Sequence, residues 1–218
     1  MAKKKMVLAF NTVQRLTHWL VTVAFAVLVL TGMTLFVPWI GGLSQGAAGQ
    51  LLRQWHRIGF VIGVVAVLIY LIFAPKSLFD SLKRIFRWGK NDFGWIKAAP
   101  SYYFTGDETA MPPQDKFNAG QKLWYLVVVI GGLILLLTGL LMWFGLGSIP
   151  TGLFRLSAFL HSLTAIVMVI FFLVHFYMAV VHPLMKDSLD SMRFGYLPEE
   201  YVRSHHARWY EEIKAGKS

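Results

Sequence analysis

Four long stretches without charged residues constrain the fold of this chain more than any other feature. They are Leu16–Ile40, Ile58–Pro75, Leu123–Phe154 and Leu156–Met185. Each is long and apolar enough for a helix that crosses a bilayer, which needs roughly 17–25 residues. The sequence therefore predicts an all-α membrane protein with a single domain over residues 1–218. Its four transmembrane helices are expected at about residues 16–40, 55–75, 119–146 and 153–185, with a loop at 76–118 and a tail at 186–218.

The charged residues fall almost entirely on one side of such a bundle. All 11 acidic residues and all but three of the 21 Lys and Arg residues lie in the N-terminal tail, the 76–122 segment or the C-terminal tail. Because Lys and Arg accumulate on the cytoplasmic side of membrane proteins, we predict that both termini are cytoplasmic. The net charge of +10 is then a topology signal, and we expect no nucleic-acid partner for a chain that is 56% hydrophobic.

Four histidines lie within or beside these apolar stretches: His18, His56, His161 and His175. The last two are 14 residues apart on one predicted helix. This spacing is close to four turns, so both imidazoles face the same way, separated by roughly 21 Å along the axis. Ionisable residues inside a membrane are costly and usually functional. One histidine towards each leaflet suits a stack of two b-type haems.

Depth in the membrane pairs the histidines. With cytoplasmic termini, His18 and His175 lie towards the cytoplasm, whereas His56 and His161 lie towards the periplasm. We therefore predict two haem b groups, each with an iron bound by one of these pairs. The chain has no cysteine, which excludes thiolate ligation of an iron–sulfur cluster and covalent haem attachment. The alternative for each histidine is a hydrogen bond to a neighbouring helix.

The other three histidines are weaker candidates for ligands. His182 follows His175 by seven residues, so on a continuous helix it shares nearly the same face. It would however lie about 31 Å from His161, which is too far for fast electron tunnelling. We interpret it as an interfacial or supporting residue. His205 and His206 lie in the charged tail, where we expect them to be solvated.

Three segments outside the membrane have recognisable patterns. Residues 77–88 place apolar side chains on one face and predict an amphipathic helix at the membrane interface. Residues 98–117 contain three prolines and little periodicity, and predict a loop. Pro198 and the acidic residues after it predict a short helix that runs to about residue 214.

The three basic residues on the opposite side have a possible role beside haem. Arg53, Arg57 and Arg155 are candidates to neutralise haem propionates through charge-assisted hydrogen bonds. Anchoring at the membrane interface is the alternative for all three. Gly32 is 14 residues after His18, which gives the first helix a bare patch at the depth of the periplasmic haem.

Six short motifs run in order through nearly the whole chain: Arg15-Leu-Thr-His18-Trp19, Trp55-His56, Phe117-Asn-Ala-Gly-Gln-Lys122, Arg155-Leu-Ser-Ala-Phe-Leu-His161, His175-Phe-Tyr-Met-Ala179 and His205-His-Ala-Arg-Trp-Tyr210. In these motifs the chain resembles the cytochrome b (gamma) subunit of membrane-bound respiratory formate dehydrogenases. The four-histidine framework alone is shared with cytochrome b subunits of hydrogenases and thiosulfate reductases. The third and sixth motifs are more specific to the formate dehydrogenase group.

The resemblance implies that the four histidines are the haem ligands, with the pairing that depth predicts. It implies a quinone, menaquinone or ubiquinone, beside the cytoplasmic haem near Asn118, Gly120, Gln121 and His175. Asn118 with Gln121 three positions later also predicts a capping box at the start of the third helix. The implied partners are an iron–sulfur (beta) subunit and a molybdenum or tungsten catalytic (alpha) subunit in the bacterial inner membrane.

The sequence thus predicts the quinone-reducing, membrane-anchoring subunit of an oxidoreductase complex. Electrons would enter from a periplasmic iron–sulfur subunit, cross two haems and reduce a quinone near the cytoplasmic face, while a partner subunit oxidises formate. One alternative is the same di-haem module serving a hydrogenase or thiosulfate reductase. Another is a stand-alone di-haem cytochrome of the b561 type. A small transporter or anchor without haem is the remaining alternative.

Overall fold

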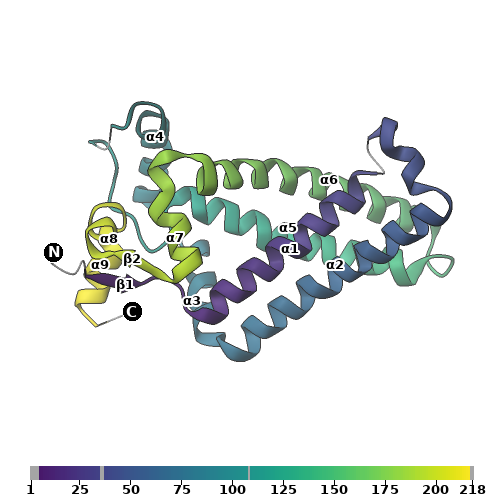
Figure 1. The fold of residues 1–218 in the computed structure, drawn as a ribbon, viewed down its shortest axis with the longest axis horizontal. Coiled ribbons are helices and arrows are strands. Elements are labelled where there is room, and N and C mark those ends of the chain that lie inside the picture. Colours follow the sequence, from purple (N-terminus) through teal and green to yellow (C-terminus); the bar gives the residue numbers. More distant parts are fainter. Residues whose placement is uncertain (1–4, 35–36, 108, 217–218) are drawn as a thin grey trace. The chain divides into compact units, whose positions relative to one another are not determined.

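The computed structural model describes residues 5–34, 37–107 and 109–216, and most of them are helical (Figure 1). Four helices are long and apolar enough to cross a membrane. They are α1 (Thr12–Met33), α2 (Gly46–Phe73), α5 (Ala119–Gly145) and α6 (Thr151–Phe176). The helical membrane fold predicted from the four uncharged stretches is confirmed.

The chain divides into two compact units. Leu8–Asp80 form one unit, here called the α1–α2 unit. Met1–Val7 and Ser81–Ser218 form the other, here called the α5–α6 unit. The first strand of the chain therefore belongs with the last two thirds of the sequence, and α1 and α2 are inserted between them.

In the α1–α2 unit, α1 begins at a capping box. The Asn11 side chain accepts a hydrogen bond from the Gln14 N–H, and the Gln14 side chain accepts one from the Asn11 N–H. This cap starts the helix four residues before the predicted residue 16. The predicted continuation to residue 40 crosses positions 35 and 36, which lie outside the described residues. Pro38–Ser44 form a separate 3₁₀ helix, η1.

Polar contacts align α1 with α2 near one end of the pair. The Gln14 side chain donates a hydrogen bond to the Tyr70 hydroxyl at 3.0 Å, and the Thr17 hydroxyl donates to the Ala66 carbonyl at 3.4 Å. Ala66 is fully buried. In a membrane the hydrophobic effect does not drive helices together, because lipid is as apolar as the apolar side chains. Close packing of small residues and hydrogen bonds between helices stabilise the contact instead.

In the α5–α6 unit, α5 begins at the predicted capping box of Asn118 and Gln121. The last membrane helix does not continue unbroken to residue 185. α6 ends at Phe176, a π-helical turn η2 covers Tyr177–Val181, and a short 3₁₀ helix η3 covers Pro183–Met185. Such π turns carry an i→i+5 bond, seen here from the His182 N–H to the Tyr177 carbonyl.

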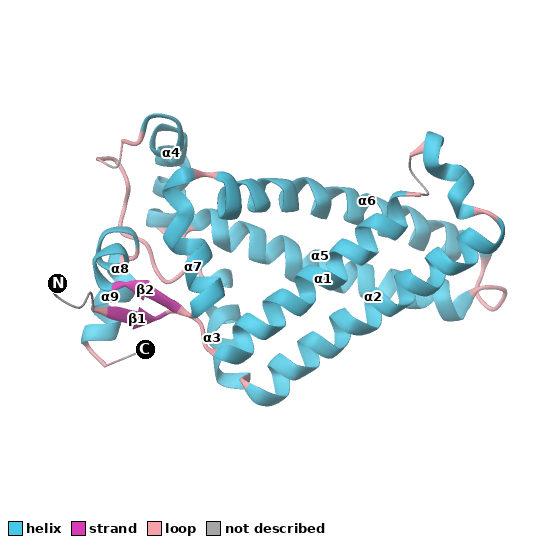
Figure 2. Cartoon of the chain, viewed as in Figure 1, coloured by secondary structure: helices cyan, strands magenta, loops and turns pink. Residues whose placement is uncertain are grey.

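The segments outside the four long helices are also mostly helical (Figure 2). They are α3 (Pro75–Phe86), α4 (Lys90–Thr105), α7 (Lys186–Phe194), α8 (Glu199–His205) and α9 (Ala207–Lys214). α3 coincides with most of the amphipathic helix predicted at residues 77–88, but it begins two residues earlier and ends two residues earlier. Two short strands, β1 (Met6–Leu8) and β2 (Tyr196–Pro198), pair as a two-stranded sheet that the sequence did not predict.

Two predictions for these segments are wrong. The expected loop at 98–117 begins later, because α4 continues through Pro100 to Thr105 and is capped by Gly106, which has φ = 75°. A glycine in the left-handed region is a common helix terminator. The expected tail helix is broken at His206, whose non-helical backbone (φ = −129°, ψ = 46°) separates α8 from α9. Burial of Tyr102 in α4 accounts for a helix where the proline count alone favours a loop.

Candidate functional site

His56 lies on α2 with its ring against α1. Its Nδ1 atom is 2.8 Å from the hydroxyl oxygen of Thr31. The residue after this threonine is Gly32, and a Cβ placed there would lie 3.7 Å from the His56 Cε1 atom. The bare patch predicted at Gly32 is therefore where the His56 ring rests.

His161 is held in the same way in the other unit. Its Nδ1 atom is 2.9 Å from the hydroxyl oxygen of Thr138 on α5. A Cβ placed at Gly139 would lie 3.4 Å from the His161 Cε1 atom. We call the pairs Thr31–Gly32 and Thr138–Gly139 the Thr–Gly seats. Sequence analysis missed both threonines, although Leu-Thr-Gly occurs in both helices, because the triplet gains meaning only when each helix meets its partner.

The other two predicted ligands lie beside tryptophans. The His175 ring stacks on Trp124 of α5, with centroids 5.1 Å apart and planes inclined by 18°. His18 contacts Trp19 edge to face, with centroids 5.1 Å apart. His175 is the second-last residue of α6, and only Phe176 separates it from the π-helical turn. All four predicted ligands are half-buried on long apolar helices.

His182 differs from these four residues in its surroundings. It is 8% exposed, and its Nε2 atom is 3.3 Å from the Tyr103 carbonyl oxygen. Its Nδ1 atom accepts a hydrogen bond from the Leu184 N–H at 3.4 Å. The expectation that His182 shares a helix face with His175 is wrong, because the π-helical turn breaks the register and the helix ends at Val181.

His206 is buried, so the expectation that it is solvated is wrong. It is 5% exposed, and its Nδ1 atom lies 2.7 Å from the Asp115 carbonyl oxygen. Burial lowers the pKa of His206 to about 4, against a smaller opposing effect of this hydrogen bond. His205 is half-buried and stacks on Tyr201 with centroids 4.3 Å apart.

The amide element at the start of α5 is structured by its own capping box. Asn118 and Gln121 use their side-chain oxygens to accept each other's backbone N–H at 2.9 and 3.0 Å. Among the described residues no hydrogen bond uses either side-chain amino group, so both can donate elsewhere. At Gly120 a Cβ would come within 2.9 Å of the Trp95 ring, so the glycine seats this tryptophan of α4.

A buried ion pair lies directly beside this element. The Lys122 ammonium is 2.7 Å from an Asp92 carboxylate oxygen and 3.0 Å from the Arg87 carbonyl oxygen. The two side chains are 2% and 4% exposed. The pair fixes α4 to the first turn of α5. Sequence analysis missed Asp92, because nothing in the local pattern of α4 identifies its partner.

The remaining predicted residues are exposed. Arg53 and Arg57 lie on α2 on either side of His56 in sequence, and Arg155 lies near the start of α6. One Arg53 nitrogen donates a hydrogen bond to the Ser44 carbonyl at 3.2 Å. Their side chains therefore remain accessible to an anionic group.

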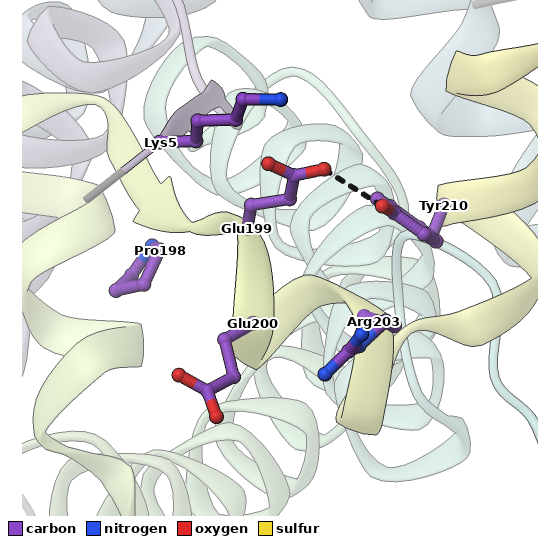
Figure 3. Close-up of a pocket in the computed structure, with 6 residues that line it drawn as sticks. All are labelled: Lys5, Pro198, Glu199, Glu200, Arg203 and Tyr210. Atoms are coloured by element: carbon purple, nitrogen blue, oxygen red, sulfur yellow. Dashed lines mark hydrogen bonds between the residues drawn. The ribbon is translucent and has the colours of Figure 1, made fainter. Parts of the chain in front are cut away.

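A hollow of about 470 Å³ lies in the tail of the α5–α6 unit (Figure 3). Tyr210 donates a hydrogen bond to Glu199 across it at 2.7 Å. None of its lining residues is a predicted site residue. They are Lys5, Pro198, Glu199, Glu200, Arg203 and Tyr210.

The chain is similar to known proteins along its whole length. It is 27% identical to the cytochrome b556(Fdn) subunit of the nitrate-inducible formate dehydrogenase of Escherichia coli (strain K12), over 100% of this chain and 96% of that protein. It is 27% identical to the formate dehydrogenase cytochrome b556 subunit of Haemophilus influenzae, over 94% of this chain and 83% of that protein. The cytochrome b556(fdo) subunit of E. coli is 23% identical over 98% and 96%.

The donor set in the structure fits a b-type haem. Imidazole nitrogen is a common axial ligand of haem iron, and this chain offers four half-buried imidazoles on apolar helices. At two of them the neighbouring residue on the adjacent helix is a glycine, so no side chain crowds the ring. Residues 9–195 match the family described as prokaryotic cytochrome b561. With these histidines and a match over most of its length, the chain belongs to the prokaryotic cytochrome b561 family.

Proposed function

We propose that this protein is the membrane-anchoring cytochrome b subunit of a formate dehydrogenase complex. It would carry electrons from a periplasmic iron–sulfur subunit through two haem b groups to a quinone near the cytoplasmic face. The observation that carries the electron-transfer role is the set of four helix-borne histidines, two of them in matching Thr–Gly seats. Similarity to formate dehydrogenase cytochrome b556 subunits over the whole chain supports the choice of complex.

The ligand pairs are His18 with His175 and His56 with His161. Depth in the predicted topology supports this pairing, and the shared Thr–Gly seats group His56 with His161 without reference to depth. Each haem, when bound, supplies a one-electron redox couple. The chain's part is to present neutral imidazoles, exclude water with apolar helices and neutralise propionates. Arg53, Arg57 and Arg155 serve the last purpose.

Asn118 and Gln121 bind the quinone. Their side-chain amino groups can donate hydrogen bonds to a quinone oxygen while their oxygens keep the cap of α5. The site includes Gly120 and His175. Lys122 and Asp92 hold α4 against this end of α5, so the amides keep one orientation. On the predicted cytoplasmic side, the reduced menaquinone or ubiquinone takes its protons from the cytoplasm.

The partners follow from the same topology. An iron–sulfur (beta) subunit contacts the periplasmic face, where the only charges near the helix ends are those of three arginines. A molybdenum or tungsten (alpha) subunit oxidises formate there. Because protons are released on one face and consumed on the other, charge is separated without a proton pump.

Haem analysis and co-purification test the proposal. The purified chain should contain about two non-covalent haems by the pyridine haemochrome method. His56→Ala and His161→Ala should each remove the same haem, while His18→Ala and His175→Ala should each remove the other. A content near zero, or loss of different haems within a pair, would contradict the ligand assignment. Co-purification with a nickel–iron subunit, in place of a molybdenum or tungsten subunit, would assign the module to a hydrogenase.

A further inference from the structure

We infer that Thr31 and Thr138 are positioning residues that fix the tautomer of His56 and His161 and lower the midpoint potential of the one haem these histidines share. The inference rests on the proposed haem ligation. The two threonines would contact neither the iron nor the macrocycle, and would act on the haem through the two histidine ligands.

The direction of each hydrogen bond follows from the number of protons available. A threonine hydroxyl has one proton and two acceptor positions. Thr31 gives its proton to the Val27 carbonyl at 2.7 Å, and Thr138 gives its proton to the Ile134 carbonyl at 2.6 Å. A carbonyl can only accept. Each hydroxyl oxygen is then placed to accept from the histidine, and this arrangement favours the tautomer that carries its proton on Nδ1.

This tautomer is the one that haem ligation requires when Nε2 faces the iron. A neutral imidazole has one N–H and one nitrogen lone pair. With the proton held at Nδ1, the lone pair lies on Nε2. Each Thr–Gly seat thus selects the ligating form of its histidine before haem is bound, and fixes the rotation of the ring.

The same bond tunes the redox couple. An acceptor on the far N–H raises the basicity of a metal-bound histidine. A more basic ligand stabilises the ferric state over the ferrous state, so the midpoint potential falls. Because both ligands of this haem have such an acceptor, the effect is doubled there. Apolar surroundings strengthen each bond relative to water.

The structural alternative is that the threonines only bond back to their own helix, which is common for threonine in apolar helices. Thr22 illustrates that behaviour, because its hydroxyl donates to the His18 carbonyl at 2.8 Å. Thr31 and Thr138 combine this back-bond with a contact to a histidine ring. The combination occurs once in each of two separate units, in the same Leu-Thr-Gly triplet.

Redox titration of the haem-loaded full chain tests the inference. Thr31→Val and Thr138→Val keep the side-chain shape and remove the hydroxyl. Each substitution should raise the midpoint potential of the same haem by about 59 mV. This shift corresponds to a tenfold change in the one-electron redox equilibrium constant, the size expected when a hydrogen bond to a metal-binding histidine is lost. The ferric low-spin EPR signal of that haem should shift as well. Thr→Ser at either position should restore both readouts, and Thr22→Val should leave that haem unchanged.

The outcomes separate this inference from the function beneath it. Two normal haems with unshifted potentials in both valine variants would overturn the inference and leave the ligand assignment intact. Shifts on two different haems would instead contradict the pairing of His56 with His161, and with it the statement that both threonines act on one haem. If a valine variant loses the haem and the serine variant at the same position keeps it, the hydroxyl group positions the histidine for haem binding, as inferred. If the serine variant also loses the haem, the hydroxyl group is not what positions the histidine, and the inference is wrong. A wild-type chain without haem would overturn both proposals.

Discussion

At the scale of single residues, the partners of the ring nitrogens distinguish the histidines of this chain. His56 and His161 have Nδ1 engaged by a threonine hydroxyl of the adjacent helix. His182 has both ring nitrogens engaged by backbone groups, those of Leu184 and Tyr103. A histidine with both nitrogens occupied has no lone pair to offer iron.

His182→Gln should therefore retain two haems with unchanged absorption spectra. Glutamine can still donate a hydrogen bond to the Tyr103 carbonyl, so the segment after the π-helical turn should keep its place. Haem content and difference spectra of the purified variant provide the measurement. Loss of one haem would mean that His182, and not His175, is a ligand.

The capping box makes it possible to separate binding from folding at the amide element. Asn118→Asp keeps the oxygen that caps α5 but removes the amino group, and a carboxylate is favourable at a helix N-terminus. We expect stability near that of the wild type and about 2–10-fold weaker binding of a quinone-analogue inhibitor, the value of one hydrogen bond. Inhibitor titration of quinone reduction measures this. Asn118→Ala is the matched variant, because it should lose the cap as well, at about 1 kcal/mol.

At the scale of elements, hydropathy located the four long helices but not their ends. The absence of charged residues shows that a segment can lie in lipid. The position of a helix end depends instead on a few capping hydrogen bonds. The sequence contains the Asn11-x-x-Gln14 motif that caps α1, whereas the uncharged stretch begins only after Arg15. The π-helical turn after Phe176 changes neither composition nor charge, so no apolar count can detect it.

The candidate site was predictable to the same degree. The four histidines were found because a polar group in an apolar stretch is conspicuous, and the cap of α5 because its residues are adjacent. The Thr–Gly seats and the partner of Lys122 depend on residues 23–30 positions apart, and only packing of two helices brings them together.

The buried ion pair between α4 and α5 gives a prediction for element packing. Lys122→Met should destabilise the protein by about 3–5 kcal/mol, because it leaves the buried Asp92 carboxylate without its cationic partner. Adding Asp92→Leu should recover much of that loss. Thermal unfolding of the purified single and double variants measures both effects. A single variant as stable as the wild type would show that Asp92 reaches solvent.

Buried His206, at the break between α8 and α9, makes the stability of the tail depend on pH. The pKa of His206 is about 4 in the folded protein, below its ordinary value of 6.5. Between these values the unfolded tail binds more protons than the folded tail, so stability falls as pH drops from about 6.5 towards 4. The slope is up to about 1.4 kcal/mol per pH unit. Hydrogen exchange over residues 199–214, corrected for intrinsic rates, should show this loss, and His206→Asn should abolish the pH dependence.

At the scale of the whole molecule, the orientation across the membrane can be tested with single thiols, because the chain has no cysteine. Ser148 lies on the exposed turn between α5 and α6, and Thr105 lies at the exposed end of α4, so each can be replaced by cysteine for labelling. In right-side-out membrane vesicles, an impermeant maleimide should label residue 148 directly and residue 105 only after permeabilisation. The reverse pattern would place the termini in the periplasm and move the proposed quinone site with them.

The pairing of β1 with β2 has a consequence for the timing of synthesis. Residues 6–8 leave the ribosome well before their partner strand at 196–198 is made. With about 190 residues between them and a synthesis rate of about 5–20 residues per second, the first strand waits ~10–40 s. During that interval its edge is unpaired and open to other chains. Ribosomes that stop before residue 196 would release a protein whose N-terminal strand never finds its partner.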